Sequence, residues 1–208
     1  MSRVGAQSDT LVGMDYDATT ALIVVDVQND FASPSGSLSV PGGESVIPFI
    51  NDQLRAATGA GAQIVYTQDW HPASTPHFEK DGGIWPVHCV GGTPGAEFHP
   101  GLDVVDDALM IKKGVGGEDG YSAFNIRDPE SGVDAATGLS DRLHELNVAK
   151  VGVLGLALDY CVKETALDAV AGGFETLVLA DGTSAVNLSP GDGSRAVAQL
   201  VEAGVSVE

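Results

Sequence analysis

Three residues of this chain have side chains suited to covalent catalysis: Asp26, Lys113 and Cys161. A cysteine attacks carbonyl carbon as its thiolate, which makes Cys161 the candidate nucleophile. Asp26 would take the thiol proton and later deliver it to a departing amine, while Lys113 would hold negative charge and keep Asp26 oriented. Each residue alone also has a structural explanation, as a capping carboxylate, a surface lysine or a small buried thiol. Together they supply a nucleophile, a proton acceptor and a cation.

The position of Cys161 favours a reactive thiol. The apolar run 151–155 predicts a buried strand, and residues 163–170 predict a helix. A thiol where a strand turns into a helix faces backbone N–H groups and the positive end of the helix dipole, and both favour the thiolate. A cysteine needed only for packing would not have to lie there.

A second set of residues suits a divalent metal ion. Two or more imidazoles and a carboxylate in one loop, without a thiolate, favour Zn, Fe or Mn with open positions for water or substrate. Prolines between the first two histidines indicate a bent loop that could bring both to one ion. Solvent-exposed loop histidines are the alternative explanation. The candidate ligands are Asp69, His71, His77 and His88.

Two aromatic residues lie close to these reactive residues in the sequence. Phe31 follows Asp26, and Trp85 precedes His88. Two aromatic side chains near a site can enclose a flat ring, although ordinary core packing explains them equally well.

The elements that must position these residues alternate between strand and helix. Such alternation predicts βαβ units and one mainly parallel, doubly wound α/β sheet, a three-layer sandwich with helices on both faces. Strands are expected at 21–26, 64–67, 108–112, 151–156, 176–180 and 205–207, and helices at 44–57, 139–146, 163–170 and 196–203. We expect residues 1–18 to form a flexible arm and 19–208 a single domain. The glycine-rich loop 114–137 has no clear period.

Reactive residues follow four of these strands. Ligands of such sheets bind beyond the carboxyl ends of the strands. Common placement at this edge is hard to explain by packing alone, so we expect one site there. The residues at or just beyond the strand ends are Asp26, Asp69, Lys113 and Cys161.

Composition narrows the functional class. The chain has 208 residues and a formal net charge of −19, which argues against nucleic acid and anionic membranes as partners. Its two cysteines make no disulfide framework, so a reducing compartment, the cytoplasm, is expected. We see no signal-peptide pattern and no apolar run near the ~20 residues of a membrane span. A homo-oligomer is compatible with the sequence, which leaves the oligomeric state open.

The chain resembles the isochorismatase-like cysteine hydrolase family, and within it the nicotinamidase/pyrazinamidase branch. Each matching segment is weak alone, but their order and spacing are highly specific, and they span roughly residues 20–185. The segments are LIVVDVQNDF at 22–31, DWHP at 69–72, HF at 77–78, WPVHC at 85–89, KG at 113–114, GLALDYCV at 155–162 and TALDA at 165–169.

The resemblance implies a six-stranded parallel sheet and hydrolysis of nicotinamide to nicotinate and ammonia through a thioester. This reaction is a step of NAD salvage, and pyrazinamide is expected as a further substrate. It implies a catalytic triad of Asp26, Lys113 and Cys161. It also implies a cis peptide before Ala157 that aims the Ala157 and Cys161 N–H groups at the oxyanion. The implied metal ligands are Asp69, His71 and His88, with His77 in some members, and the implied ring-flanking residues are Phe31 and Trp85.

Two departures from the family pattern and several rival functions remain. The loop 114–124 has a glycine-rich start that the resemblance does not explain. Leu158 stands where many nicotinamidases have threonine, which would alter the pocket wall slightly. An amidase acting on a carbamoyl or ureido compound would keep the triad but generally lack the metal set. An isochorismatase proper would not need Cys161, and a non-catalytic binding protein would be free to lose the triad.

Overall fold

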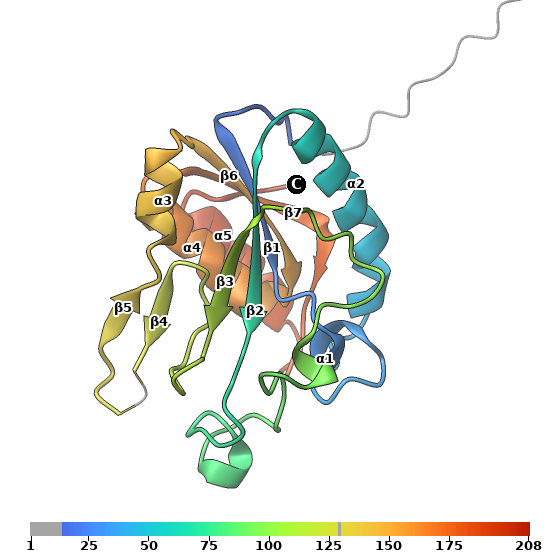
Figure 1. Ribbon diagram of the computed structural model, residues 1–208, viewed down its shortest axis with the longest axis vertical. Coiled ribbons are helices and arrows are strands. Elements are labelled where there is room, and N and C mark those ends of the chain that lie inside the picture. The colour runs from blue at the N-terminus through green and yellow to red at the C-terminus, as the bar shows by residue number, and fades with distance from the viewer. Residues whose placement is uncertain (1–13, 129) are drawn as a thin grey trace, which may run out of the picture.

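A six-stranded sheet forms the centre of the molecule, a computed structural model that describes residues 14–128 and 130–208. The strand order is β3-β2-β1-β6-β7-β8, and every neighbouring pair is parallel. This confirms the expected sheet (Figure 1). The strands are β1 (Thr20–Val25), β2 (Gln63–Asp69), β3 (Leu109–Lys113), β6 (Lys150–Leu156), β7 (Glu175–Ser184) and β8 (Ser206–Val207).

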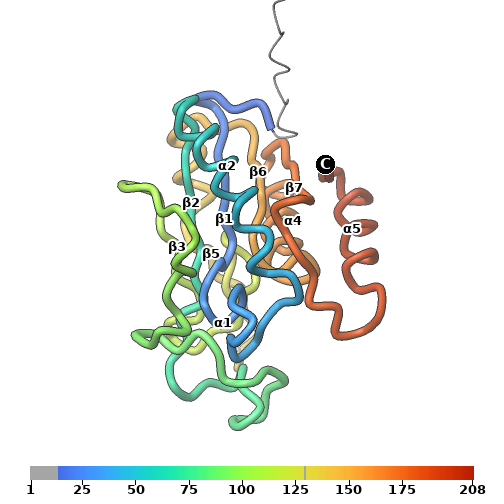
Figure 2. Tube along the Cα trace, turned by 90° about the vertical axis from the view of Figure 1, so that its right-hand side faces the viewer, coloured from blue at the N-terminus to red at the C-terminus, as the bar shows by residue number. Residues whose placement is uncertain are grey.

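Helices cover both faces of the sheet and give the molecule three layers (Figures 1 and 2). The side chains of β1 alternate between two apolar clusters: Leu22 packs with α2 on one face, and Ile23 packs with α3, α4 and α5 on the other. All six residues of β1 are buried, as expected for a strand covered on both sides. The helices are α1 (Asn29–Ala32), α2 (Ile47–Gly59), α3 (Leu139–Glu145), α4 (Lys163–Ala171) and α5 (Asp192–Glu202).

Two local features differ from the sequence-based expectation. The loop 114–137 contains an antiparallel hairpin of β4 (Asn125–Arg127) and β5 (Asp134–Ala136), whose three-residue strands are too short to show a period. The helical segment that carries Cys161 begins before α4, with a π-helical turn at Leu158–Val162. Short 3₁₀ turns lie at Gly43–Val46, Glu79–Asp81 and Pro94–Ala96.

The packed domain begins earlier than residue 19. The expected arm covers residues 1–18, of which the first thirteen lie outside the described residues. Met14 is buried in the cluster beneath α2, and the Tyr16 hydroxyl donates to Gln53 Oε1 at 2.8 Å. Among the described residues, no helix has the length and apolar character needed to cross a membrane.

Candidate active site

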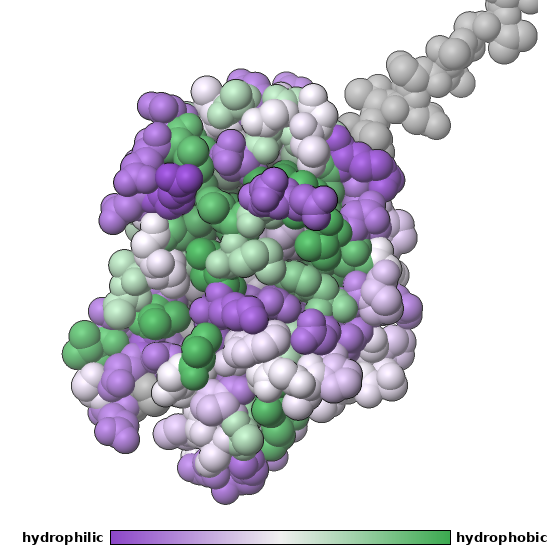
Figure 3. Space-filling view, in the orientation of Figure 1, coloured by the Kyte–Doolittle hydropathy of each residue, from purple (hydrophilic) through white to green (hydrophobic). Residues whose placement is uncertain are grey.

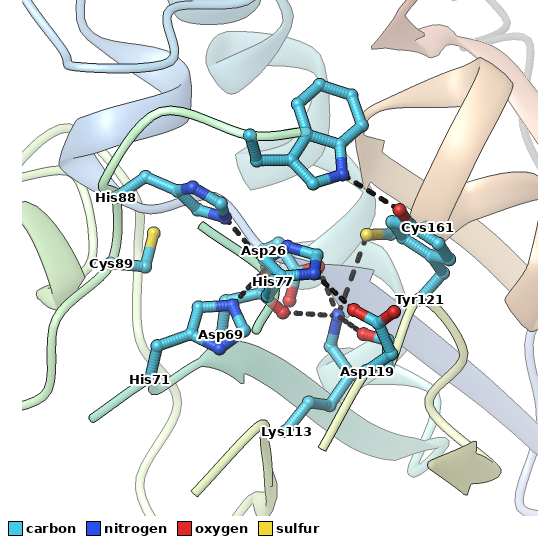
Figure 4. Close-up of polar contacts among 12 residues, drawn as sticks. Asp26, Asp69, His71, His77, His88, Cys89, Lys113, Asp119, Tyr121 and Cys161 are labelled. Carbon is cyan, nitrogen blue, oxygen red and sulfur yellow. Dashed lines mark hydrogen bonds and ion pairs between the residues drawn. The ribbon is translucent and has the colours of Figure 1, made fainter. Parts of the chain in front are cut away.

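The three predicted catalytic residues meet at the carboxyl edge of the sheet. Asp26 directly follows β1, Lys113 ends β3, and Cys161 lies in the π-helical turn after β6. Lys113 Nζ lies 2.7 Å from Asp26 Oδ2 and 3.6 Å from Cys161 Sγ (Figure 4). All three side chains are buried. The structure therefore brings together a thiol, a carboxylate and an ammonium group in one water-poor site.

Lys113 holds the centre of this network. Its Nζ also lies 2.7 Å from Asp69 Oδ1 and donates to the Gly120 carbonyl at 3.1 Å. Burial opposes the charge on Lys113, but the attraction of Asp26 and Asp69 outweighs it and raises the lysine pKa well above its usual range. Lys113 is therefore a fixed cation between two carboxylates.

Asp26 is arranged as a base. Burial and the nearby Asp69 raise its pKa, against the lowering effect of Lys113. A carboxylate with a raised pKa accepts a proton more readily. Thr67 Oγ1 donates to Asp26 Oδ1 at 2.5 Å and accepts from the Asp26 N–H at 3.1 Å, so it fixes the carboxylate. Sequence reasoning missed Thr67, since inside an apolar strand it carries no signal except β propensity.

The buried setting of Cys161 opposes the effect of the strand–helix junction, which favours the thiolate. Burial raises the pKa of its thiol well above the usual range, and Lys113 lowers it only in part. The thiol is enclosed within the π-helical turn rather than exposed at a helix N-terminus. The nearest ligand atoms of Asp26, Asp69 and Cys161 all lie within 4.8 Å of one another. A buried thiol of this kind needs a base to lose its proton, and the Asp26 carboxylate lies within reach of it.

The peptide between Leu156 and Ala157 is cis, as the family resemblance implies. Ala157 and Cys161 both line the pocket that opens above the thiol. Leu158, which was expected to alter the pocket wall slightly, is partly buried and packs against the apolar cluster that contains Ile23, and it is not among the residues that line the pocket.

Three histidines gather next to this trio. Ring nitrogens of His71, His77 and His88 lie within 4.8 Å of one another. Asp69 Oδ2 is 3.7 Å from His71 Nε2 and 3.9 Å from His88 Nε2. All four side chains are buried. The predicted metal-ligating residues thus form one cluster in the structure, His77 included.

The chemistry of this cluster fits a divalent cation. Neither ring nitrogen of His71 has a hydrogen-bond partner among the described residues, although both are buried. Burial lowers the pKa of His88 to about 4, and its Nδ1 lies 2.7 Å from the Pro86 carbonyl, which leaves a neutral ring with Nε2 available. Although burial disfavours its charge, Lys113 and the nearby His71 lower the pKa of Asp69. Neutral imidazoles and an ionised carboxylate are the forms that bind metals.

His77 has a partner that sequence reasoning missed. Its Nδ1 forms a hydrogen bond with Asp119 Oδ1. This hydrogen bond lowers the pKa of Asp119 and keeps it ionised. Asp119 lies in the glycine-rich loop that the sequence left uninterpreted. The sequence pointed to Asp119 only as a carboxylate six residues after Lys113, which did not distinguish it from other acidic residues of the loop.

A narrow pocket connects the thiol to the histidine cluster. Phe31 and Trp85, predicted to bind a flat ring, both line it. Trp85 Nε1 donates to the Tyr121 hydroxyl at 2.9 Å, and the Trp85 ring meets Tyr160 edge-on at 5.0 Å between centroids. The lining is mainly aromatic and aliphatic, and its charged or metal-binding groups are Asp69, His77, His88 and Cys161. Such a pocket suits a small planar ligand with a few polar atoms.

Comparisons with known proteins agree with this geometry. A family model described as the isochorismatase domain matches residues 20–207. The Escherichia coli (strain K12) nicotinamidase is 35% identical over 203 residues, covering 90% of this chain and 93% of that protein. The structure of Pyrococcus horikoshii pyrazinamidase in complex with zinc has a TM-score of 0.81 and 39% identity, covering 91% and 98% of the two chains. PnC1 from L. infantum in complex with nicotinate has a TM-score of 0.83 and 40% identity, covering 94% and 95%.

Proposed function

Because the chain belongs to the isochorismatase family, in its nicotinamidase/pyrazinamidase branch, we propose that its site hydrolyses nicotinamide to nicotinate and ammonia. The observation that carries this proposal is the buried Asp26–Lys113–Cys161 network, whose thiol lines one pocket together with Asp69, His77 and His88. An amidase that acts on a carbamoyl or ureido compound needs the Asp26–Lys113–Cys161 network but has no evident use for the histidine cluster.

The substrate ring would lie in the aromatic pocket, between Phe31 and Trp85. A divalent ion held by the cluster would supply a Lewis-acid site for the pyridine nitrogen, and so orient the carboxamide over Cys161. Zinc is the ion bound in the Pyrococcus relative. The residues that would hold the ion are Asp69, His71, His77 and His88.

Acylation begins when Asp26 takes the proton of the Cys161 thiol. The thiolate attacks the amide carbon, and the N–H groups of Ala157 and Cys161 bind the developing oxyanion, at about 3 kcal/mol per donor. Lys113 stays protonated and stabilises the negative charge that the proton transfers move through the site. Asp26 then returns its proton to the departing nitrogen, the C–N bond breaks, and ammonia leaves a nicotinoyl thioester on Cys161.

Deacylation uses the same base. Asp26 takes a proton from water, which attacks the thioester carbon. The C–S bond breaks, nicotinic acid leaves and loses its carboxyl proton to solvent as nicotinate, and the proton on Asp26 passes to the cysteine sulfur. The site is thereby restored with its thiol and carboxylate.

Ammonia release from nicotinamide, measured with zinc-loaded protein, tests this function. The wild type should release ammonia and nicotinate in equal amounts. Cys161→Ala should fold and lose essentially all turnover, whereas Cys89→Ala, which removes the chain's other thiol, should retain it. Faster ammonia release from a carbamoyl or ureido compound than from nicotinamide would contradict the proposed substrate.

A further inference from the structure

We infer that Asp119 is a positioning residue for the metal centre: it holds His77 through Nδ1 and so presents Nε2 to the cluster of His71 and His88. The inference rests on the proposed metal site and goes beyond its ligand set. It gives a role to the loop 114–137, which carries none of the predicted ligands.

The geometry at His77 supports this role. Asp119 Oδ1 bonds to His77 Nδ1, and the His77 ring stacks on the His71 ring at 4.8 Å between centroids and 22° between planes (Figure 4). A neutral imidazole that donates its Nδ1–H to a carboxylate keeps its lone pair on Nε2. Metal-binding histidines commonly depend on such carboxylate partners, which fix the tautomer and raise the basicity of the ligating nitrogen.

Asp119 is itself held by backbone. Its N–H donates to the Arg127 carbonyl at 2.8 Å, and the Arg127 N–H returns a bond to the Asp119 carbonyl at 2.5 Å. Arg127 ends β4, so the short hairpin braces the carboxylate from behind. The hairpin therefore supports Asp119 from outside the pocket, since no residue of β4 or β5 lines it.

Two further contacts join the same pair of loops. Thr75 Oγ1 donates to the Gly117 carbonyl at 3.1 Å on one side of the His77–Asp119 pair, and Trp85 bonds to Tyr121 on the other. The loop of metal ligands and the glycine-rich loop are thus connected at three successive points. Because the two flanking contacts do not involve Asp119, its replacement should leave the loops together and change only the support of His77.

Zinc titration of metal-free protein tests the inference directly. Removing such a carboxylate typically costs 10–100-fold in metal affinity. We expect Asp119→Ala to weaken zinc binding by that factor and Asp119→Asn to weaken it less. Glu118→Gln is the matched control, because it removes one negative charge from the neighbouring residue, whose carboxylate bonds only within its own loop, to the Gly116 N–H. That variant should bind zinc as the wild type does.

A double-mutant cycle and a spectrum separate positioning from a general loss of structure. In a His77→Ala background, Asp119→Ala should cause no further loss of zinc affinity. Histidine ¹⁵N spectra of the metal-free wild type should show His77 protonated at Nδ1, and Asp119→Ala should lose this preference. Wild-type affinity in Asp119→Ala, or an equal loss in the His77→Ala background, would overturn the inference. These titrations need no substrate, so a failure to hydrolyse nicotinamide would refute the proposed function separately.

Discussion

At the scale of single residues, the site is organised by an imbalance of charge. Lys113 lies between Asp26 and Asp69, so two buried carboxylates share one buried cation. An unpaired buried carboxylate is costly. Asp69 faces the histidines with its other oxygen, where a divalent cation would compensate the excess negative charge. Lys113 would then compensate mainly the charge of Asp26 and of the Cys161 thiolate, and the metal would compensate the charge of Asp69.

Asp26 should set the acid limb of the pH profile. Its pKa is raised above 3.8, chiefly by burial, and only the carboxylate can accept the thiol proton. As pH falls through that raised pKa, Asp26 becomes protonated and kcat/KM should fall in proportion. Asp26→Asn should lose about 10²–10⁴-fold in rate, the usual contribution of a general base.

The measurement is kcat/KM against pH, with zinc content determined at each point. Zinc content is the control, because protonation of His88, whose pKa burial lowers to about 4, would compete with metal binding at the acid end of the profile. A kcat/KM that shows no fall on the acid side while the metal is retained would contradict the role of Asp26.

Some residues of the site could be predicted from local sequence pattern, and others could not. Asp26, Lys113 and Cys161 lie at or just beyond the ends of apolar strands. Because ligands of such sheets bind beyond the carboxyl ends of the strands, the sequence predicted that these three residues lie in one site. Thr67 and Asp119 act through side-chain contacts with partners 41 and 42 residues away. Such pairings depend on how strands and loops lie in space, and no local pattern in one sequence contains them.

At the scale of elements, the register between β1 and β6 aligns the base with the nucleophile. Val25 pairs with Gly155, so Asp26 and the Leu156–Ala157 peptide leave the sheet side by side. Gly155 has φ +110°, and a Cβ there would lie 2.1 Å from the Val25 carbonyl oxygen. Only glycine permits this close approach of the two strands.

Gly155→Ala should therefore damage both stability and activity. Backbone strain of this kind costs about 1–3 kcal/mol, and the contact with Val25 adds to it. We expect the free energy of unfolding in urea to fall by at least about 2 kcal/mol. Gly59→Ala, at the end of α2 with no atom within 4 Å of the added Cβ, is the matched control and should lose no stability. Equal stability of the two variants would contradict this prediction, because it would mean that β1 and β6 can move apart at Gly155 without loss of stability.

The loops that form the pocket should select for a ring nitrogen. Phe31 and Trp85 would accept any flat ring, but the histidine cluster offers a partner only to a polar ring atom. Sites built for a polar atom reject analogues without it far better than apolar pockets reject a missing methylene. Benzamide should thus be hydrolysed at least ~100-fold less efficiently than nicotinamide by kcat/KM. Comparable kcat/KM values for the two amides would argue against orientation through the ring nitrogen.

Strands and longer helices followed from the sequence because each has enough residues to show a period. The aliphatic run of β1 and the helical spacing in α2 are examples. The β4–β5 hairpin did not follow, since its strands are three residues each and largely exposed. The hairpin holds Asp119 through backbone hydrogen bonds with Arg127, and a hydrophobic pattern in the sequence does not predict such bonds.

At the scale of the whole molecule, the dominant property is a formal net charge of −19, from 29 acidic and 10 basic residues. On the face in Figure 3, hydrophilic side chains form separate groups among apolar ones, which extend across the middle of the view. Charge this far from zero destabilises the compact state through self-repulsion. The Debye length falls from about 30 Å at 0.01 M salt to about 3 Å at 1 M, so salt should relieve the repulsion.

The melting temperature should consequently rise with salt concentration. KCl and NaCl should act alike between 0.01 and about 1 M, since the effect is screening rather than specific binding. Thermal unfolding by circular dichroism at fixed pH and fixed zinc measures this. A melting temperature that stays constant or falls over that range would contradict the account of the charge.

The most direct test of the account is the covalent state of Cys161 during turnover. Zinc-loaded protein mixed with nicotinamide and quenched in acid within one turnover should carry one nicotinoyl group, located on the Cys161 peptide by mass spectrometry. The Cys89 peptide should be unmodified, and Cys161→Ala should carry no adduct. Turnover of nicotinamide by the wild type without any acyl group on Cys161, or by Cys161→Ala at an undiminished rate, would contradict the account.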